Sequence, residues 1–479
     1  MNQGSSYKSI LKYTSLFGGV QGINIIVGLI RNKLVAVLLG PNGFGFISLL
    51  NSTIKVLSDS SSLGLPMSAV RHISDYFEQG EEEKTRHYIK VVRSWCLLTA
   101  LLGAFLCVAL APLLNQWTFT WGDHTRHFMF LAPVVFFTAI TGGELAVLKG
   151  SRHLKALAQI SVINVLAALV ISIPLFYFFG QSGIIPSMNL VALCACAVTA
   201  GYSYHYYPLH RGKEKFFAEG LEMVKVGVFF TLAGIAGSIA EMAIRTYLNN
   251  VGDLDLVGYY NAGFMICVTY AGMVFAAMET DYFPRISAAW HDRFKMNETI
   301  NHQVEVSLLM VGPLLVAMVI LLPVLIPLLF TGEFQTVIPM AQVAILAMYF
   351  HAVDLPIEYL PLAKGDSLTY LIVETIYDVF FVFMIILGYQ YWGLLGTGIA
   401  LTFAHLINCI AIVLYYSWRY GVRLSRKALL IFVAQTLFGL MAYAFTYILD
   451  GAAYWVIGCA LLVINTIFSY LLFKKGCRA

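Results

Sequence analysis

Cationic side chains occur inside three long apolar segments, 15–39, 44–67 and 226–250, on faces that also carry amide and hydroxyl groups. At about 100° per residue the polar residues of each segment share one arc, which a helix facing lipid would not carry. A charge at the centre of a membrane-spanning helix costs about 2.5–3.5 kcal/mol, so it indicates a partner, a cavity or a function. Arginine binds phosphate through bidentate, charge-assisted hydrogen bonds. These faces predict a central chamber that binds a phosphate or diphosphate group through Asn24, Arg31, Asn51, Lys55, Ser238 and Arg245.

The same charges also have the spacing to neutralise one another along a helix. Lys55 and Asp59 are four residues apart, as are Glu241 and Arg245, which is the spacing of an intrahelical ion pair. The sequence leaves anion binding and internal pairing open as alternatives. Arg31 has no acidic residue four positions before or after it. We therefore place Arg31 first among the residues expected to bind an anion.

A second group of titratable residues lies in the segments 336–362 and 368–389. At helical spacing His351, Asp354 and Glu358 share one face, and two further carboxylates share a face of the next segment. Carboxylates gathered at membrane depth beside a histidine are typical of a proton relay or a sodium site. The alternative is a hydrogen-bonded polar seam between two helices. The sequence predicts H⁺ or Na⁺ coupling at His351, Asp354, Glu358, Glu374 and Asp378.

The composition requires a membrane around these segments. Of the 479 residues 59% are hydrophobic and 12% are charged. A helix needs about 20 apolar residues to cross a bilayer, and the chain contains fourteen segments of that length. We predict an all-α integral membrane protein with about 14 transmembrane helices, at 15–39, 44–67, 91–113, 127–148, 156–179, 184–206, 226–250, 257–283, 304–330, 336–362, 368–389, 393–418, 429–449 and 452–473.

Lysine and arginine residues are concentrated in alternate joints between these segments. All but five of the 30 lie in the N-terminal tail and every second joint, whereas the opposite set of joints holds only Arg126. The positive-inside rule then places both termini in the cytoplasm. The outward joints are too short for an external catalytic domain, so we expect no enzyme activity. The small net charge of +4, without basic runs, does not favour nucleic acid binding.

Cysteine usage and loop motifs argue against metal and nucleotide chemistry. Eight cysteines lie in apolar stretches or in the basic C-terminal tail, and Cys194 and Cys196 lack the spacing and second pair of a zinc site. The chain has no Gly-rich loop leading into Lys-Ser or Lys-Thr, as ATP hydrolysis would need. The sequence predicts no metal centre and no cofactor apart from the coupling ion.

The chain repeats its landmarks at an offset of 213 to 215 residues. Arg31 corresponds to Arg245 and Glu144 to Glu358. Six helices per repeat is an even number, so both repeats enter the membrane in the same sense, as a parallel pseudo-two-fold repeat with a substrate site expected between its lobes. We predict an N-lobe of six helices at 1–215, a C-lobe of six helices at 216–427, and two C-terminal helices at 428–479.

Three short motifs resemble a known family. Residues 31–45, RNKLVAVLLGPNGFG, resemble the first-to-second-helix signature of bacterial polysaccharide transport proteins, the lipid-linked oligosaccharide (O-antigen) flippases. Residues 257–262 and 282–287 resemble the start and the end of the eighth helix of these proteins. The resemblance covers the whole chain in helix number and lobes. It places the chain in the MATE-like multidrug, oligosaccharidyl-lipid and polysaccharide (MOP) exporter superfamily.

The resemblance implies a substrate and a location. The chain would flip an undecaprenyl-diphosphate-linked oligosaccharide, such as an O-antigen unit of lipopolysaccharide, across the bacterial inner membrane by alternating access. Its partners would be this lipid-linked oligosaccharide, membrane lipids and other polysaccharide assembly proteins. Arg31, Lys55 and Arg245 would be the basic cavity residues. Many members have twelve helices, and the additional pair here either forms a groove for the lipid tail or packs outside.

Other functions fit parts of the same pattern. A drug or cation antiporter of the same superfamily is the first alternative, although an organic cation favours an acidic or aromatic cavity over one with Arg31 and Lys55. A membrane polysaccharide polymerase or ligase would act on the same lipid but would need a larger external loop. A scaffold without transport activity leaves the polar faces without a purpose.

For the flippase, we predict that Arg31→Ala abolishes surface polysaccharide while the chain still inserts into the membrane. Loss of the phosphate-binding guanidinium should cause lipid-linked repeat units to accumulate inside the cell. The measurement is surface polysaccharide and extracted lipid-linked intermediates at matched expression. Normal export by the variant would remove Arg31 from the binding site.

Overall fold

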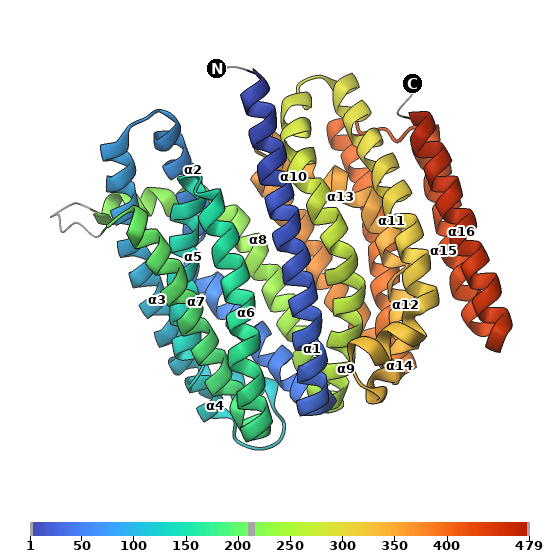
Figure 1. The fold of residues 1–479 in the computed structure, drawn as a ribbon, viewed down its shortest axis with the longest axis horizontal. Coiled ribbons are helices and arrows are strands. Elements are labelled where there is room, and N and C mark those ends of the chain that lie inside the picture. Colours follow the sequence, from blue (N-terminus) through green and yellow to red (C-terminus); the bar gives the residue numbers. More distant parts are fainter. Residues whose placement is uncertain (1–2, 209–215, 477–479) are drawn as a thin grey trace. The chain divides into compact units, whose positions relative to one another are not determined.

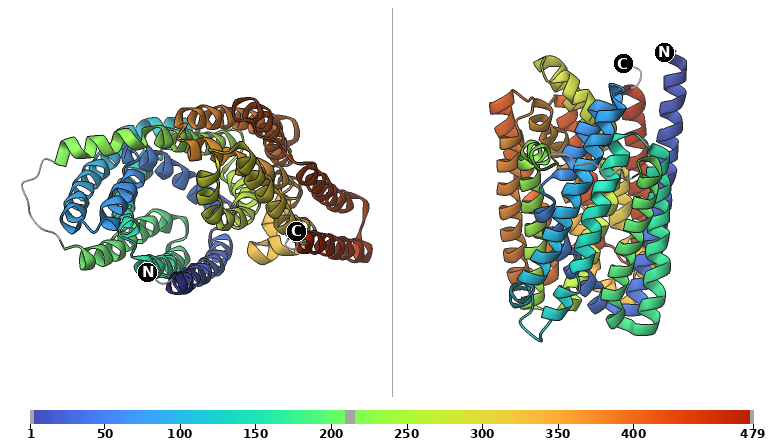
Figure 2. Two further views of the ribbon diagram at one scale, coloured as in Figure 1. Left: turned by 90° about the horizontal axis from the view of Figure 1, so that it is seen from above. Right: turned by 90° about the vertical axis from the view of Figure 1, so that its left-hand side faces the viewer.

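The computed structural model describes residues 3–208 and 216–476, and these residues form helices and connecting turns without a strand (Figure 1). The predicted all-α membrane fold is therefore confirmed. The contacts divide the chain into two compact units, Met1–Asp255 and Leu256–Ala479. Within each unit the long helices run roughly parallel or antiparallel to one another, as the views in Figure 2 make clear.

Unit 1 is built on α1, which packs against α6 and α8, while α5 packs against α3 and α7. Its elements are α1 (Gln3–Ser62), α2 (Leu65–Glu78), α3 (Glu82–Thr118), α4 (Thr125–Met129), α5 (Ala132–Gly150), α6 (Leu154–Phe179), the 3-10 turn η1 (Gly180–Gly183), α7 (Ile184–Tyr206) and α8 (Phe216–Val251).

Unit 2 is built on α11, which packs against α10, α13, α15 and α16, while α13 packs against α14. Its elements are α9 (Leu254–Phe264), the π-helical turn η2 (Met265–Tyr270), α10 (Ala271–Ala289), α11 (Arg293–Leu329), the 3-10 turn η3 (Gly332–Val337), α12 (Ile338–Ala344), α13 (Ala347–Lys364), α14 (Ser367–Tyr420), α15 (Arg426–Ile448) and α16 (Gly451–Gly476).

Two of the long helices each contain two predicted spans joined at a glycine. In α1 the break is at Gly40, with φ 65° and ψ −170°, and in α14 it is at Gly393, with φ 57° and ψ −140°. Residues with a Cβ rarely adopt these angles, so glycine permits a reversal within very few residues. Pro41 follows Gly40 at a first helical position, where no backbone N–H is needed. The breaks coincide with two of the short outward joints expected from the sequence.

Eight helices in the described ranges are long and apolar enough to cross a membrane, and the bent pair Gly332–Ala344 and Ala347–Lys364 makes a ninth. Three of the eight, Gly19–Ser62, Leu154–Tyr206 and Ser367–Tyr420, each contain two predicted spans. The predicted segment 226–250 lies in α8, and 257–283 lies in α9, η2 and α10. The total of fourteen crossings stays a prediction.

The predicted lobe boundaries also stay predictions. The boundary after residue 215 adjoins residues 209–215, which lie outside the described residues. Helix α8, the expected first helix of the C-lobe, packs against α1, α2 and α3 of unit 1. The C-terminal pair α15 and α16 packs on α11 in unit 2. The contact of α8 with α1 places Arg245 beside α1. The contact of α13 with α14 places the acidic cluster between these two helices.

Candidate functional site

Two of the predicted cations in unit 1 share one carboxylate. The ammonium nitrogen of Lys55 on α1 lies 2.8 Å from Oε1 of Glu241 on α8, and Nη1 of Arg245 lies 3.4 Å from Oε2 of the same residue. Nε of Arg245 also donates to Ser48 Oγ at 2.9 Å. The side chain of Arg245 is 8% exposed and that of Lys55 is 48% exposed. Arg245 is therefore fixed between the helices, and Lys55 is the accessible cation of the group.

The intrahelical pairing that competes with anion binding is present only in part. Glu241 and Arg245 do form the pair of residues four positions apart. Lys55, however, pairs across helices with Glu241 and not with Asp59. The carboxylate of Asp59 instead accepts a hydrogen bond from Ser238 on α8. We call Lys55, Asp59, Ser238, Glu241 and Arg245 the α1–α8 polar cluster.

The open face of the second half of α1 is polar. Between residues 41 and 62 only Asn51 and Lys55 are exposed, and every other residue is buried or half-buried. They are four positions apart and so lie on the same side of the helix. A lipid-facing helix would expose apolar side chains instead. The exposed amide and ammonium groups therefore indicate a hydrated or ligand-binding surface on this side of α1.

Arg31 and Asn24 lie in the first half of α1, on the side that meets α6. Asn24 Nδ2 donates to Ser161 Oγ at 2.8 Å, and Nη2 of Arg31 lies 3.5 Å from Ser172 Oγ. Nε of Arg31 is buried and has no hydrogen-bond partner among the residues that the structure describes. At 1.5 Å per residue Arg31 lies about 14 Å below the break at Gly40. Unlike Lys55 and Arg245, this guanidinium at membrane depth is held by one long hydrogen bond.

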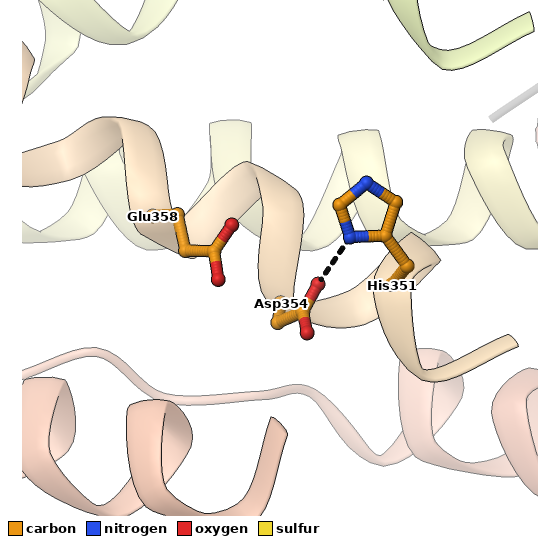
Figure 3. Close-up of side chains that lie close together, drawn as sticks. All are labelled: His351, Asp354 and Glu358. Atoms are coloured by element: carbon orange, nitrogen blue, oxygen red, sulfur yellow. Dashed lines mark hydrogen bonds and ion pairs between the residues drawn. The ribbon is translucent and has the colours of Figure 1, made fainter. Parts of the chain in front are cut away.

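The acidic cluster in unit 2 is centred on α13 (Figure 3). Nδ1 of His351 lies 3.0 Å from Oδ1 of Asp354, whose side chain is 1% exposed. One donor or acceptor atom from each of His351, Asp354 and Glu358 lies within 4.8 Å of the others, a spacing that a bound cation can bridge. Pro356 lacks the backbone N–H that would bond to the Ala352 carbonyl, so the helix is weakened within the cluster.

Two residues of α14 outside the predicted coupling set complete the acidic cluster. Nδ2 of Asn408 on α14 lies 3.0 Å from Oε1 of Glu358 and 3.4 Å from Oδ2 of Asp354, so one amide bridges both carboxylates. His405, one turn earlier, shares a 2.7 Å hydrogen bond with Tyr377, and its ring lies 5.7 Å from that of His351. In the sequence, these two residues could have been found as an imidazole and an amide three positions apart in an apolar segment.

The two predicted carboxylates of α14 lie at the margin of this cluster. Glu374 interacts electrostatically with Asp354, His351 and Asp378. Among the residues that the structure describes, Glu374 forms no hydrogen bond to a side chain of α13. The structure thus joins His351 to Asp354 directly, places Glu358 within 4.8 Å of them and in contact with Asp354 through Asn408, and leaves Glu374 at longer range.

Unit 1 contains a buried ion pair, between Arg93 and Glu144, that the sequence analysis did not predict. Arg93 was expected among the basic residues of an inner joint, but its side chain is only 10% exposed and its Nε lies 3.0 and 3.2 Å from the two carboxylate oxygens of Glu144. Its other nitrogens donate to Ser203 Oγ and to the Tyr207 carbonyl. The guanidinium therefore joins α3, α5 and the end of α7. Four other basic residues were assigned to the same joint, namely Arg71, Lys84, Arg86 and Lys90, and burial is not visible in the charge pattern, so this role of Arg93 was not predicted.

The partner of Glu144 differs from that of Glu358, its counterpart in the predicted sequence repeat. Glu144 and Glu358 are 214 positions apart, the offset of the repeat predicted from the sequence. Glu144 is neutralised by an arginine, whereas Glu358 is hydrogen-bonded by the neutral amide of Asn408 and lies beside Asp354. An amide carries no charge, so Asn408 does not neutralise Glu358 as Arg93 neutralises Glu144.

Comparison with solved structures identifies the fold. A lipid II flippase, MurJ, in an inward closed conformation matches with a TM-score of 0.73 and 16% identity over 97% of this chain and 100% of its own. An inward-facing multidrug resistance MATE family transporter of the MOP superfamily matches with a TM-score of 0.70 and 14% identity over 83% of this chain and 94% of its own. A MOP superfamily transporter from Pyrococcus furiosus matches with a TM-score of 0.62 and 14% identity over 86% of this chain and 96% of its own. The fold is that of the MOP-superfamily transporters.

The family follows from the sequence match. A family model described as polysaccharide biosynthesis protein matches residues 10–290, and the chain belongs to this family. No match was found among curated proteins. The resemblance deduced from the short motifs is confirmed at the level of the family, and the solved structures match at the level of the fold.

The Arg93–Glu144 contact generates a stability prediction. Arg93→Gln leaves a buried carboxylate without its cation, which costs about 3–5 kcal/mol in buried pairs. We expect a large drop in the free energy of unfolding, measured by denaturant titration in detergent micelles, and partial recovery in the Arg93→Gln/Glu144→Gln double variant. Arg86→Gln, an exposed arginine on the same helix, is the control. Equal stability of Arg93→Gln and Arg86→Gln would contradict the structural role.

Proposed function

We propose that this protein flips a lipid-linked oligosaccharide with a diphosphate head group from the cytoplasmic to the periplasmic leaflet by alternating access. The observation that carries the proposal is the polar open face of α1, where Asn51 and Lys55 are exposed beside Glu241 and Arg245. The polysaccharide biosynthesis family supports the class of substrate. A structural neighbour named as a lipid II flippase supports movement of a lipid-linked molecule.

Lys55 is the proposed first contact for the diphosphate. Its ammonium group has three N–H donors, and the contact with Glu241 leaves others for a ligand. An incoming phosphate would compete with Glu241 for Lys55, while Arg245 retains the glutamate through Nη1. The exchange lets the head group bind without leaving Glu241 as an uncompensated buried anion.

Arg31 is the proposed second contact. Its guanidinium has five donors in a fixed fork, and the contact with Ser172 uses one of them. A phosphate with two oxygens can satisfy this fork bidentately, which an ammonium group cannot do. The prenyl chain of the substrate can stay in the hydrocarbon layer, so only the diphosphate and the sugars need a polar path.

The acidic cluster of unit 2 is the proposed coupling site. Asp354 and Glu358 can share a proton, with His351 as the neighbouring acceptor, or can supply oxygen ligands to Na⁺. The Ala352 carbonyl, which Pro356 deprives of its usual N–H partner, is a further oxygen for a cation. Arg93 prevents the corresponding glutamate of unit 1 from playing this part.

A drug or cation antiporter is the second candidate, because multidrug transporters share the fold. Such a protein would present an acid to its cationic substrate. The accessible charge on α1 is instead Lys55, while Glu241 and Asp59 are engaged by Lys55, Arg245 and Ser238. The anionic substrate is therefore the better fit to this surface.

The exchange of Lys55 from Glu241 to phosphate predicts opposite effects of two variants. Lys55→Gln should lower flipping of a prenyl-diphosphate oligosaccharide by about tenfold or more, since it removes a charge-assisted contact. Glu241→Gln should tighten head-group binding, because the competing carboxylate charge is gone. Purified protein in liposomes, with head-group accessibility measured on each leaflet, gives both quantities.

Lys149→Gln is the matched control, because Lys149 is an exposed lysine of α5 outside the cluster. Unchanged flipping in Lys55→Gln, or weaker binding in Glu241→Gln, would refute this mechanism. Transport of organic cations without flipping would favour the antiporter instead.

The coupling site is tested separately. Flipping driven by an imposed proton or sodium gradient should lose its gradient dependence in Glu358→Gln and Asp378→Asn, while slow flipping without a gradient persists. Glu83→Gln, an exposed acid at the start of α3, should retain full coupling. The ion whose gradient drives wild-type flipping identifies the coupling ion, and unaltered coupling in both variants would reduce the cluster to a structural seam.

A further inference from the structure

An apolar groove lies on unit 2 between the second half of α14 and the start of α15. Its volume is about 200 Å³ and its lining has no polar surface. Val304 and Val353 form its floor from α11 and α13, and its walls include Ile410, Leu414, Leu424 and Phe432. The groove is partly open, and Ile410 and Leu414 are exposed. It has the character of a surface for a hydrocarbon chain.

The connection between α14 and α15 contributes Leu424 to the lining of this groove and is rich in basic residues. Two of them are neutralised: Arg419 pairs with Asp366 at 3.1 Å, and Lys427 pairs with Glu305 at 2.6 Å. Arg423 and Arg426 are exposed, and neither side chain has a hydrogen bond or ion pair to the residues that the structure describes. Two uncompensated guanidinium groups therefore flank Leu424 at the mouth of the groove.

The backbone of the connection is held rigidly by two asparagines of α11. Asn297 donates to the Gly421 carbonyl at 3.1 Å and accepts from Arg423 N at 2.6 Å. Asn301 donates to the Arg423 carbonyl at 2.8 Å and accepts from Ser425 N at 2.7 Å. Both backbone groups of Arg423 are thus fixed while its side chain is free to bind, which lowers the entropy cost of capturing a ligand.

The order of residues along the end of α14 matches the layers of a bilayer. Leu414, which lines the groove, is 66% exposed, and Trp418, one turn further, is 79% exposed. Arg419 and Arg423 follow. Exposed aliphatic side chains suit the hydrocarbon layer, tryptophan suits the interface, and arginine suits the head-group phosphates.

We propose that an anionic glycerophospholipid binds here, with an acyl chain in the groove and its phosphate on Arg423 and Arg426. Charge complementarity selects the anionic head group, and the apolar lining selects the chain. The site is separate from the α1–α8 polar cluster, and the inference does not depend on the transport activity. A prenyl diphosphate shares the phosphate chemistry, but a single-chain groove of about 200 Å³ beside two arginines suits a phospholipid of the surrounding leaflet.

The test is native mass spectrometry of the full chain in detergent, titrated with phosphatidylglycerol, phosphatidylcholine or undecaprenyl diphosphate. Wild-type protein should bind phosphatidylglycerol about tenfold or more tightly than phosphatidylcholine, since each arginine near the phosphate contributes about 1 kcal/mol. Arg423→Gln/Arg426→Gln should remove this preference. Arg71→Gln/Arg86→Gln, which removes two exposed arginines of unit 1, should retain it.

A groove variant separates chain binding from head-group binding. Val413→Phe places a ring in the groove and should weaken both phospholipids while retaining the preference for the anionic one. Equal binding of the two phospholipids by wild-type protein, or an unchanged preference in Arg423→Gln/Arg426→Gln, would overturn the proposal. Displacement of phosphatidylglycerol by equimolar undecaprenyl diphosphate would also overturn it, because the groove would then belong to the substrate.

Discussion

The need to neutralise charge at membrane depth governs both units of this protein. In unit 1 one carboxylate, Glu241, compensates two cations, Lys55 and Arg245, and thereby joins α1 to α8. Because the two oxygens of Glu241 are used separately, Lys55 can leave without freeing Arg245. A single glutamate thus gives structural cohesion and still leaves an accessible cation, which is the property that an anion-binding surface requires.

Glu144 and Glu358, which are counterparts in the predicted sequence repeat, have chemically different partners. At one position of the repeat Arg93 holds Glu144 in a satisfied contact that ties three helices together. At the corresponding position Asn408 bridges Glu358 and Asp354 without supplying a charge. The first arrangement supplies a cation to the carboxylate, and the second supplies only a neutral hydrogen-bond donor. The two glutamates therefore differ in their partner: Glu144 has the guanidinium of Arg93, and Glu358 has the amide of Asn408.

Neutralisation of charge also distinguishes the basic residues around the connection between α14 and α15 of unit 2. Arg419 and Lys427 have carboxylate partners, whereas Arg423 and Arg426 are exposed beside an apolar groove. Placing uncompensated arginines near head-group phosphates is favourable, since lipids supply the missing anions. This boundary therefore holds both compensated and uncompensated basic residues, and in our proposal anionic lipids pair with the uncompensated ones.

The sequence by itself determined the membrane class, the helical fold, the short joints beside the two helix breaks and the family, because these depend on apolar length and short motifs. It also placed Lys55, Arg245, His351, Asp354 and Glu358 on polar faces. Only the tertiary structure decided their partners: Lys55 meets Glu241 and not Asp59, Arg93 is buried, and Asn408 bridges the acids. Helical periodicity fixes the side of a helix on which a residue lies, but the neighbour on that side comes from a segment up to 197 positions away, and its identity depends on packing.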